Sequence, residues 1–220
     1  MKDVKNVSCY PINLQLSHQP CVVVGGGSVA ERKVAGLLAA GGTVTVLSPH
    51  LSKNLVALVE GKEITHVARN YQQGDVKGFF IIICATDDNR VNKLIAEEGR
   101  SLGALVNVAD APELGNFTVP SQISHGDLLF TISTGGKSPA LAKKLREELE
   151  AQYGPEYGIY LELVAKARKQ IKKRLSTVKE RELFWRRTLD QEVIILLKAG
   201  RIKEAEAKIN NAIGCSGTQS

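Results

Sequence analysis

The stretch Cys21-Val22-Val23-Val24-Gly25-Gly26-Gly27-Ser28-Val29-Ala30 decides the fold. An apolar, β-branched run ends in three glycines, and apolar residues at helical spacing follow. Gly25 permits a sharp turn, Gly27 lets the backbone approach a pyrophosphate, and Ala30 lets the helix pack closely on the sheet. The stretch therefore predicts a strand, a tight turn and a helix whose N-terminus binds the phosphates of a dinucleotide.

The same alternation of elements continues to about residue 109. The order β-α-β-α-β-β-α-β with short connections predicts a doubly wound parallel sheet of the Rossmann type. Either Asp87 or Asp88 is expected to cap the third helix. Strands are predicted at 21–24, 44–48, 64–68, 79–85 and 105–109, and helices at 30–40, 51–60 and 90–102.

The pattern changes after this sheet. Two strand-like segments, 116–120 and 128–133, are joined by His125-Gly126-Asp127 without a helix between them. Ser138-Pro139 then begins a helix, and beyond the break at Gly154-Pro155 only helical patterns follow. The predicted organisation is a Rossmann-type domain at 1–112, a segment with two strands and a helix at 113–150, a helical domain at 151–215, and a disordered polar tail.

Composition narrows the class of protein. The chain has 220 residues, none of its apolar runs approaches the roughly 20 residues that cross a bilayer, and Met1–Lys5 does not resemble a signal peptide. A soluble, cytoplasmic protein is expected. The four cysteines form no C-x-x-C pair, so neither a metal site nor a disulfide framework is expected. Residues 151–220 hold 14 basic and 8 acidic side chains, which accounts for the whole net charge of +6.

Four motifs in order suggest a family. They are Gly-Gly-Gly-Ser-Val-Ala-Glu-Arg-Lys at 25–33, Ala-Thr-Asp-Asp at 85–88, Asn-Val-Ala-Asp-Ala-Pro-Glu-Leu at 107–114, and Ser-Thr-Gly-Gly-Lys-Ser-Pro-Ala-Leu-Ala at 133–142. Over about residues 8–150 the chain resembles the precorrin-2 dehydrogenase/sirohydrochlorin ferrochelatase family, which also forms the N-terminal module of multifunctional sirohaem synthases. The length leaves no room for the methyltransferase domain of those enzymes, so the free-standing form is expected.

The resemblance implies an activity and partners. It implies NAD-dependent oxidation of the tetrapyrrole precorrin-2 to sirohydrochlorin, followed in some members by insertion of Fe²⁺. It also implies a homodimer formed through the segment after the nucleotide domain, here the strands at 116–133, and an active site in a cleft between the nucleotide domain and the helical part. Whether this chain inserts iron stays open.

The cofactor is expected to contact residues at the ends of three strands. An acidic residue often holds the adenosine ribose at the end of the second strand, but Ser48 stands there. The residues alone therefore leave NAD and NADP open, and NAD follows from the resemblance. The expected cofactor contacts are Gly25, Gly27, Ser28, Val29, Ser48, Pro49, Ala85 and Thr86.

Asp110 is the expected catalytic residue. It lies just past the end of a predicted strand, where ligands bind in open α/β sheets, and it matches the functionally essential aspartate of the family. A carboxylate there can accept a proton from the macrocycle while a hydride leaves for nicotinamide. The alternative is a turn or cap aspartate before Pro112. The family often has a second acidic residue next to this one, and this chain has Ala111 instead.

Other polar residues have weaker arguments. Thr134 and Lys137, beside the glycines before the Ser138-Pro139 helix, are expected to hold a substrate carboxylate, with an ordinary loop as the alternative. A role for His125 is left open, because a lone loop histidine is usually a turn residue. The basic side chains within residues 151–220 either pair with substrate carboxylates or face water. The sequence does not say which of these residues would contact a substrate.

Two other functions compete with the dehydrogenase. A regulatory module that senses a nucleotide without catalysis would share the fold but would not need Asp110. A nucleic-acid binder would use the basic C-terminus, but the few aromatic residues and the lack of a reading motif argue against it.

Overall fold

The computed structural model describes residues 9–215, so the expectations for Met1–Lys5 and for the tail after residue 215 fall outside the described residues. The chain divides into two compact units, Met1–Val119 and Pro120–Ser220. We call them the N-terminal unit and the C-terminal unit and describe each by itself. None of the described helices is both long enough and apolar enough to span a membrane.

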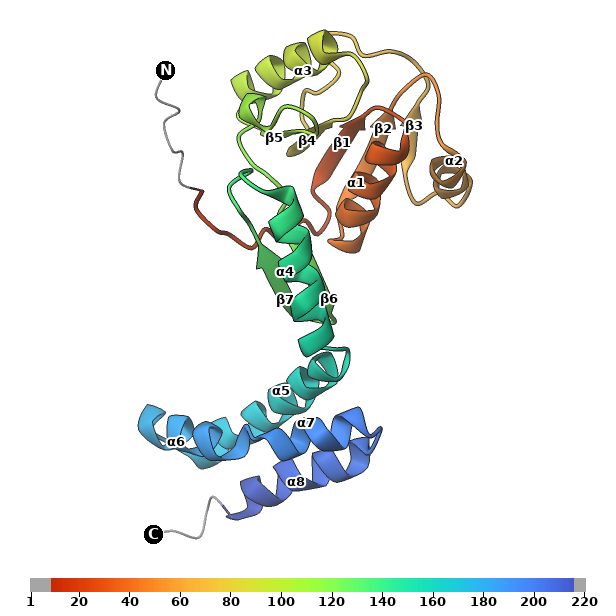
Figure 1. The fold of residues 1–220 in the computed structure, drawn as a ribbon. Coiled ribbons are helices and arrows are strands. Elements are labelled where there is room, and N and C mark those ends of the chain that lie inside the picture. The colour runs from red at the N-terminus through yellow and green to blue at the C-terminus, as the bar shows by residue number, and fades with distance from the viewer. Residues whose placement is uncertain (1–8, 216–220) are drawn as a thin grey trace. The chain divides into compact units, whose positions relative to one another are not determined.

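The N-terminal unit is built on one parallel sheet (Figure 1). The strand order is β3-β2-β1-β4-β5, so the chain first moves toward one edge and then returns to the other side of β1. This confirms the predicted Rossmann-type sheet and the predicted order of its elements. The elements are β1 (Pro20–Val24), α1 (Ser28–Ala39), β2 (Thr43–Leu47), α2 (Lys53–Glu60), β3 (Thr65–Val67), β4 (Ile81–Cys84), α3 (Asn89–Ser101), β5 (Leu105–Val108) and the 3₁₀ turn η1 (Pro112–Leu114).

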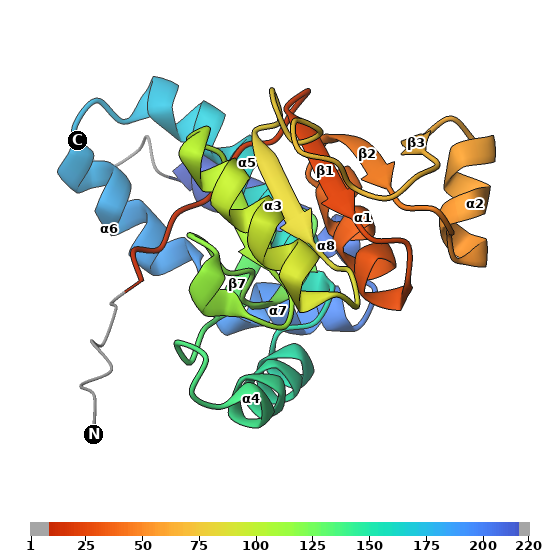
Figure 2. The same cartoon turned by 90° about the horizontal axis from the view of Figure 1, so that it is seen from above.

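Successive residues of the central strands belong alternately to two different hydrophobic cores. Val23 and Ile83 lie in a cluster with α1 and α2, whereas Val22, Val24 and Ile82 lie in a cluster with α3. Because neighbouring side chains of a strand point to opposite faces, α1 and α3 cover opposite faces of the sheet. Figure 2 shows α3 and the row of β1, β2 and β3 from above. Burial of both faces explains why the strands read as continuous apolar runs.

Local signals at the helix ends behave as expected. Gly41 follows α1 with φ +81°, in the left-handed region that favours glycine at this position. Of the two aspartates before α3, Asp88 is the cap, because its carboxylate accepts from the backbone N–H groups of Arg90 and Val91. These hydrogen bonds lower the pKa of Asp88.

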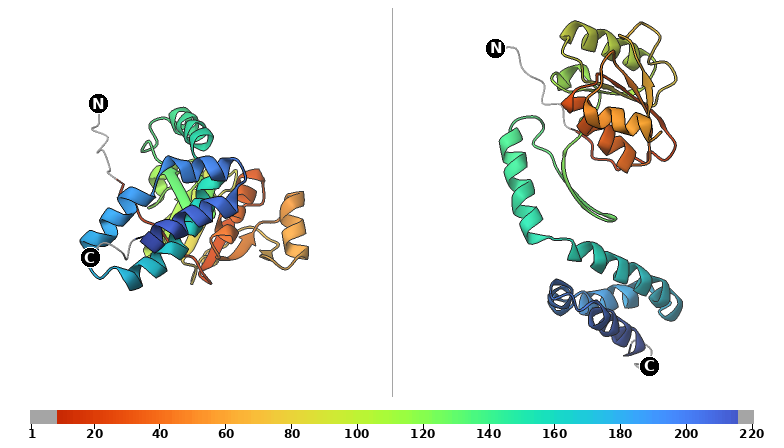
Figure 3. Two further views of the ribbon diagram at one scale, coloured as in Figure 1. Left: turned by 90° about the horizontal axis from the view of Figure 1, so that it is seen from below. Right: turned by 90° about the vertical axis from the view of Figure 1, so that its right-hand side faces the viewer.

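The C-terminal unit begins with a two-stranded antiparallel sheet and continues as helices. The strands β6 (Ser121–His125) and β7 (Leu128–Ile132) pack against α4 (Pro139–Gln152). In Figure 3 the hairpin and α4 are green, and the helices after them are turquoise to blue. Ser138 caps α4, and Thr177 with Glu180 forms the predicted capping box of α6. The helices are α5 (Glu156–Arg174), α6 (Val178–Thr188), α7 (Gln191–Lys198) and α8 (Ile202–Cys215).

The predicted strand at 116–120 is wrong, because the first strand of this pair is β6 at Ser121–His125. Asn116 instead bonds along the free edge of β5. Its Oδ1 accepts from the N–H of Val106 at 2.7 Å, and its Nδ2 donates to the carbonyl of Ala104 at 2.9 Å. Pro120 has no N–H to give to a strand partner. The predicted first strand therefore lies about five residues too early in the chain.

The two parts of the C-terminal unit are unequally packed. The helices α5, α7 and α8 share a core that includes Leu163, Ile171 and Ile209. Among the described residues of β6, β7 and α4, only Ile123 and Ala142 are buried. The hairpin and α4 therefore have little core of their own, although they carry exposed large apolar side chains: Leu129, Leu141 and Leu145.

Candidate active site

The predicted cofactor residues of the N-terminal unit and Asp110 lie at the carboxyl edge of one sheet. Gly25 follows β1, Ala85 follows β4 and Ala109 follows β5, and the last residues of these strands are paired in register. With neighbouring strands about 4.8 Å apart, Gly25 and Ala109 lie about 10 Å apart across the sheet. The edge between β1 and β4 is the switch point of this topology, where open α/β sheets bind their ligands.

The three glycines have different surroundings. A Cβ on Gly25, which has φ +122°, would lie 2.2 Å from the carbonyl oxygen of Ala85. A Cβ on Gly26 would lie 1.9 Å from the carbonyl oxygen of His50. A Cβ on Gly27 would meet nothing within 4 Å. The first two glycines therefore pack against the neighbouring loops, and the third faces open space.

The open side of Gly27 coincides with the start of α1. Gly27 caps this helix, and its cap has no side-chain hydrogen bond. The first backbone N–H groups of a helix have no partner inside the helix, so those of Ser28 and Val29 are available to an anion. These features fit the pyrophosphate of a dinucleotide, and they define the N-terminal unit as a dinucleotide-binding domain of the Rossmann class.

The loop after β2 folds back on the glycine turn. The N–H of Ser52 donates to the carbonyl of Gly26 at 2.8 Å. Ser48 is buried, and its hydroxyl donates to the carbonyl of His50 at 2.8 Å, so its hydrogen is used within the loop. A contact of Ser48 with the ribose stays a prediction. The exposed Pro49 lines a pocket of about 310 Å³ together with residues that include His50, Leu51 and His66.

Glu31, which the sequence analysis did not single out, holds this loop from α1. Its carboxylate accepts from Asn54 Nδ2 at 2.6 Å and from Ser52 Oγ at 2.8 Å, and these two bonds lower the pKa of Glu31. Glu31 therefore joins the first turn of α1 to the start of α2. Its partners lie 21 and 23 residues away in the chain, so local sequence patterns do not reveal the pairing.

Asn92, also missed by the sequence analysis, holds the loop after β4. It is 2% exposed and its side-chain amide bonds only to Thr86 among the described residues. Its Oδ1 accepts from Thr86 Oγ1 at 2.7 Å, and its Nδ2 donates to the Thr86 carbonyl at 2.9 Å. Asn92 therefore holds the loop after β4 at Thr86. The signal available in the sequence was an asparagine at a position that belongs to the apolar stripe of the helix.

Asp110 lies on the surface at the end of β5. The β4–β5 pairing extends one residue further, since the N–H of Ala109 donates to the carbonyl of Cys84 at 3.0 Å. The following turn η1 is capped by Ala111 without a side-chain hydrogen bond, so Asp110 is not its cap. Within residues 9–215, the Asp110 carboxylate takes part in no hydrogen bond or ion pair. The carboxylate is therefore available for chemistry at this edge.

Three further side chains of the sheet, those of Asn107, Cys84 and Cys21, are structural. The Nδ2 of Asn107, which is buried, donates to the carbonyl of Phe117 at 3.1 Å, as expected for a hydrogen bonder at a strand end. Burial raises the pKa of the Cys84 thiol to about 12 and also raises that of Cys21. Both thiols are thus neutral side chains of the core at physiological pH.

The predicted substrate residues Thr134 and Lys137 belong to the C-terminal unit. The Thr134 hydroxyl accepts from the N–H of Ser138 and donates to its carbonyl, both at 3.2 Å. It thereby closes a loop whose Gly135 and Gly136 have φ +60° and +78°. Lys137 is exposed in this loop. The hydroxyl has a structural task, and binding of a substrate carboxylate by Thr134 or Lys137 stays a prediction.

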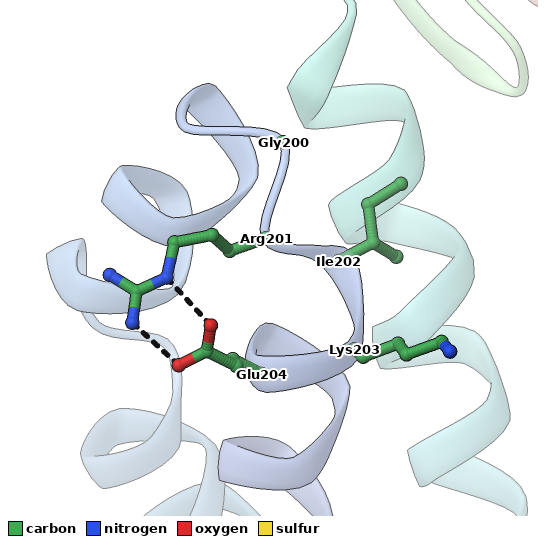
Figure 4. A pocket seen from close by; sticks show the side chains of 5 residues that line it. All are labelled: Gly200, Arg201, Ile202, Lys203 and Glu204. Carbon is green, nitrogen blue, oxygen red and sulfur yellow. Dashed lines mark hydrogen bonds and ion pairs between the residues drawn. The ribbon is translucent and has the colours of Figure 1, made fainter.

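His125 and a second pocket also lie in the C-terminal unit. The ring Nε2 of His125 bonds to the carbonyl of Tyr153 at 2.8 Å, which ties the end of β6 to the end of α4. The pocket, of about 370 Å³, is lined by Gly200–Glu204 and by no predicted site residue. Figure 4 shows Arg201 turned toward Glu204, with which it forms two bonds of 2.7 and 2.6 Å. This pocket contains no unpaired acid.

Comparisons with known proteins agree with this class. Three family models match consecutive parts of the chain: putative NAD(P)-binding at residues 12–121, sirohaem biosynthesis protein central at 131–152, and sirohaem synthase dimerisation region at 156–213. The chain therefore has an NAD(P)-binding domain, which confirms the class of the expected cofactor. The dimerisation model falls on the helices after Glu156, beyond the strands to which the sequence analysis assigned the dimer.

Relatives and a solved structure point the same way. The chain is 35% identical over 207 residues to the siroheme synthase of Vesicomyosocius okutanii and 42% identical over 176 residues to that of Methylobacillus flagellatus. These matches cover 92% and 80% of the chain, but only 44% and 38% of the relatives. The structure of SirC, a precorrin-2 dehydrogenase, matches with a TM-score of 0.75 and 27% identity, over 92% of this chain and 100% of that one.

The chain belongs to the putative NAD(P)-binding family, and its later parts match the central and dimerisation regions of sirohaem synthases. It spans less than half the length of the two sirohaem synthases named above.

Proposed function

We propose that this protein is an NAD-dependent dehydrogenase that oxidises precorrin-2 to sirohydrochlorin. The observation that carries the proposal is the pairing of two features on one sheet edge, namely the open phosphate cradle at Gly27 and the unpaired carboxylate of Asp110. The family and the likeness to SirC, whose name gives it as a precorrin-2 dehydrogenase, support the choice of substrate.

Each residue of the site has a separate task in this reaction. The N–H groups of Ser28 and Val29 bind the pyrophosphate, and the walls at Ala85 and His50 hold the glycine turn in shape. NAD, when bound, supplies the acceptor for the hydride. Asp110 accepts the proton that leaves the macrocycle, as a general base at the β5 end of the edge. A positioned base of this kind contributes about 10²- to 10⁴-fold to a rate.

Turnover of precorrin-2 tests the activity directly. With NAD and precorrin-2, we expect NADH and sirohydrochlorin to form in equal amounts, each followed by its absorbance. Binding of NAD without any turnover would instead identify a module that senses a nucleotide without catalysis. NADP in place of NAD settles the choice of dinucleotide, which Ser48 leaves open. Incubation of the parent and of Asp110→Asn with sirohydrochlorin and Fe²⁺ decides whether iron is inserted and whether Asp110 serves that step as the proton acceptor.

The chain is further proposed to act as a homodimer through its C-terminal unit, in the cytoplasm. The dimerisation model at 156–213 supports this, and so does the thin core of β6, β7 and α4. Leu141 and Leu145, which are 48% and 36% exposed, lie one turn apart on α4. Packing of a second copy of the chain against them would remove this apolar surface from water.

Light scattering after size exclusion checks the dimer. A chain of 23.8 kDa should elute as a species of twice that mass. Leu141→Glu combined with Leu145→Glu should shift it toward the monomer, because the carboxylates oppose burial of that face. The Lys144→Glu variant alters an exposed side chain of the same helix and should remain a dimer. A monomeric parent at micromolar concentration would contradict the proposal.

A further inference from the structure

The side-chain amide of Asn92 forms three hydrogen bonds with Thr86. Asn92 Oδ1 accepts from the hydroxyl of Thr86 at 2.7 Å and lies 3.3 Å from its backbone nitrogen, which also donates to it. Asn92 Nδ2 donates to the Thr86 carbonyl at 2.9 Å. The second acceptor near the hydroxyl, the carbonyl of Asp88 at 3.1 Å, also belongs to this chain.

Thr86 is therefore left with lone pairs only. A threonine hydroxyl has one hydrogen and two lone pairs, and here either neighbouring acceptor within the chain takes the hydrogen. Its N–H is also used, so the residue has no hydrogen left for a ligand. Because Thr86 is only half-buried, the lone pairs of Oγ1 can accept from outside. A phosphate oxygen, which carries no hydrogen at neutral pH, is not a suitable partner, whereas a sugar hydroxyl is.

The position of Thr86 on the edge selects between the two sugars of a dinucleotide. Thr86 follows β4, which lies on the opposite side of β1 from β2. With the pyrophosphate at Gly27, the adenosine extends toward the end of β2. The other nucleoside then extends toward β4 and β5, where Thr86 and Asp110 lie. The sugar that meets Thr86 is thus the ribose that carries the nicotinamide.

We propose that Thr86 Oγ1 accepts a hydrogen bond from a hydroxyl of this nicotinamide ribose, and that Asn92 is the positioning residue that holds Thr86 in place for this contact. The proposal rests on the proposed function as far as the dinucleotide is concerned. It assigns the ribose contact to the loop after β4, and it gives the buried amide of α3 a task in cofactor binding besides packing.

Calorimetric titration with three nucleotides tests this assignment. ADP lacks the second ribose, ADP-ribose contains it, and NAD adds the nicotinamide. Asn92→Ala and Thr86→Val should each weaken binding of ADP-ribose and NAD about tenfold, the worth of one hydrogen bond, and leave ADP unchanged. Thr86→Ser keeps the hydroxyl and should bind like the parent. The double variant should be no weaker than either single one, because both changes remove the same bond.

Asn116→Ala provides the matched control. Asn116 also bridges backbone N–H and C=O groups, those of Val106 and Ala104, but on the free edge of β5. It should lower the melting temperature and leave all three affinities unchanged.

The outcomes separate this inference from the proposed function. Equal loss of ADP and ADP-ribose would show that Asn92 acts on the glycine turn, and unchanged affinities would show a purely structural amide; either overturns the inference. A parent protein that binds no NAD overturns the proposed function itself. If Asn92→Ala does not fold, Thr86→Val still decides, since valine has nearly the same shape as threonine.

Discussion

Gly25→Ala is expected to abolish NAD binding and to destabilise the N-terminal unit. The backbone at Gly25 has φ +122°, which L-residues rarely adopt, and the new Cβ would lie 2.2 Å from the carbonyl oxygen of Ala85. The Cβ is fixed to the backbone that follows β1, and the oxygen belongs to the backbone that follows β4, so neither can move without distorting the sheet edge. We expect a loss of about 4 kcal/mol, which lowers the melting temperature by roughly 10–15 °C.

Gly27→Ala separates stability from binding. Gly27 has φ −88° and ψ −169°, which alanine adopts readily, and its Cβ would meet nothing within 4 Å. Its melting temperature should match that of the parent, while its affinity for NAD falls at least tenfold because the methyl group occupies the space of the pyrophosphate. Circular dichroism and calorimetry measure the two quantities. Unchanged NAD affinity in Gly27→Ala would contradict a phosphate site at this turn.

Asp110→Asn should remove the chemical step and leave cofactor binding unchanged. The amide has the size of the carboxylate but does not accept a proton at neutral pH, so turnover of precorrin-2 should fall by about 10²- to 10⁴-fold. The dissociation constant of NAD should stay the same. Stability should also be unchanged, since the carboxylate makes no hydrogen bond or ion pair within the described residues.

Asp87→Asn is the matched control for this experiment. Asp87 is exposed in the loop after β4, and its substitution makes the same change of charge at the same edge of the sheet. Its turnover should stay within about twofold of the parent, because it is not placed as a base. Equal losses in both variants would indicate a general effect of charge on the acidic substrate. Full activity of Asp110→Asn would exclude Asp110 as the base.

Local patterns were sufficient to predict the sheet. The runs at 21–24 and 81–84 are apolar at every position because both faces of β1 and β4 are covered, so their burial is visible in the sequence itself. The cap at Ser138 and the capping box at Thr177 depend on residues at most three apart. The strand predicted at 116–120 was wrong because the conformation there depends on distant residues: Asn116 bonds to residues 10 and 12 positions earlier.

The site was predictable only in part. Glycine spacing placed the turn, and position after a strand placed Asp110. The different roles of Gly25, Gly26 and Gly27 were not predictable, because they depend on the carbonyls of Ala85 and His50 in two other loops. The contact of Ser48 with the ribose stays a prediction, and what the sequence did not show is that its hydroxyl donates to the carbonyl of His50.

The sequence by itself determined the order of the elements, the nucleotide-binding turn and the candidate base, because strand burial, glycine conformation and helix capping act over a few residues. Only the tertiary structure decided how the loops after β1, β2 and β4 support one another. The amides and carboxylate that join them, Asn92 and Glu31, find their partners across the fold, and a hydrogen bond between distant residues leaves no periodicity for a sequence to show.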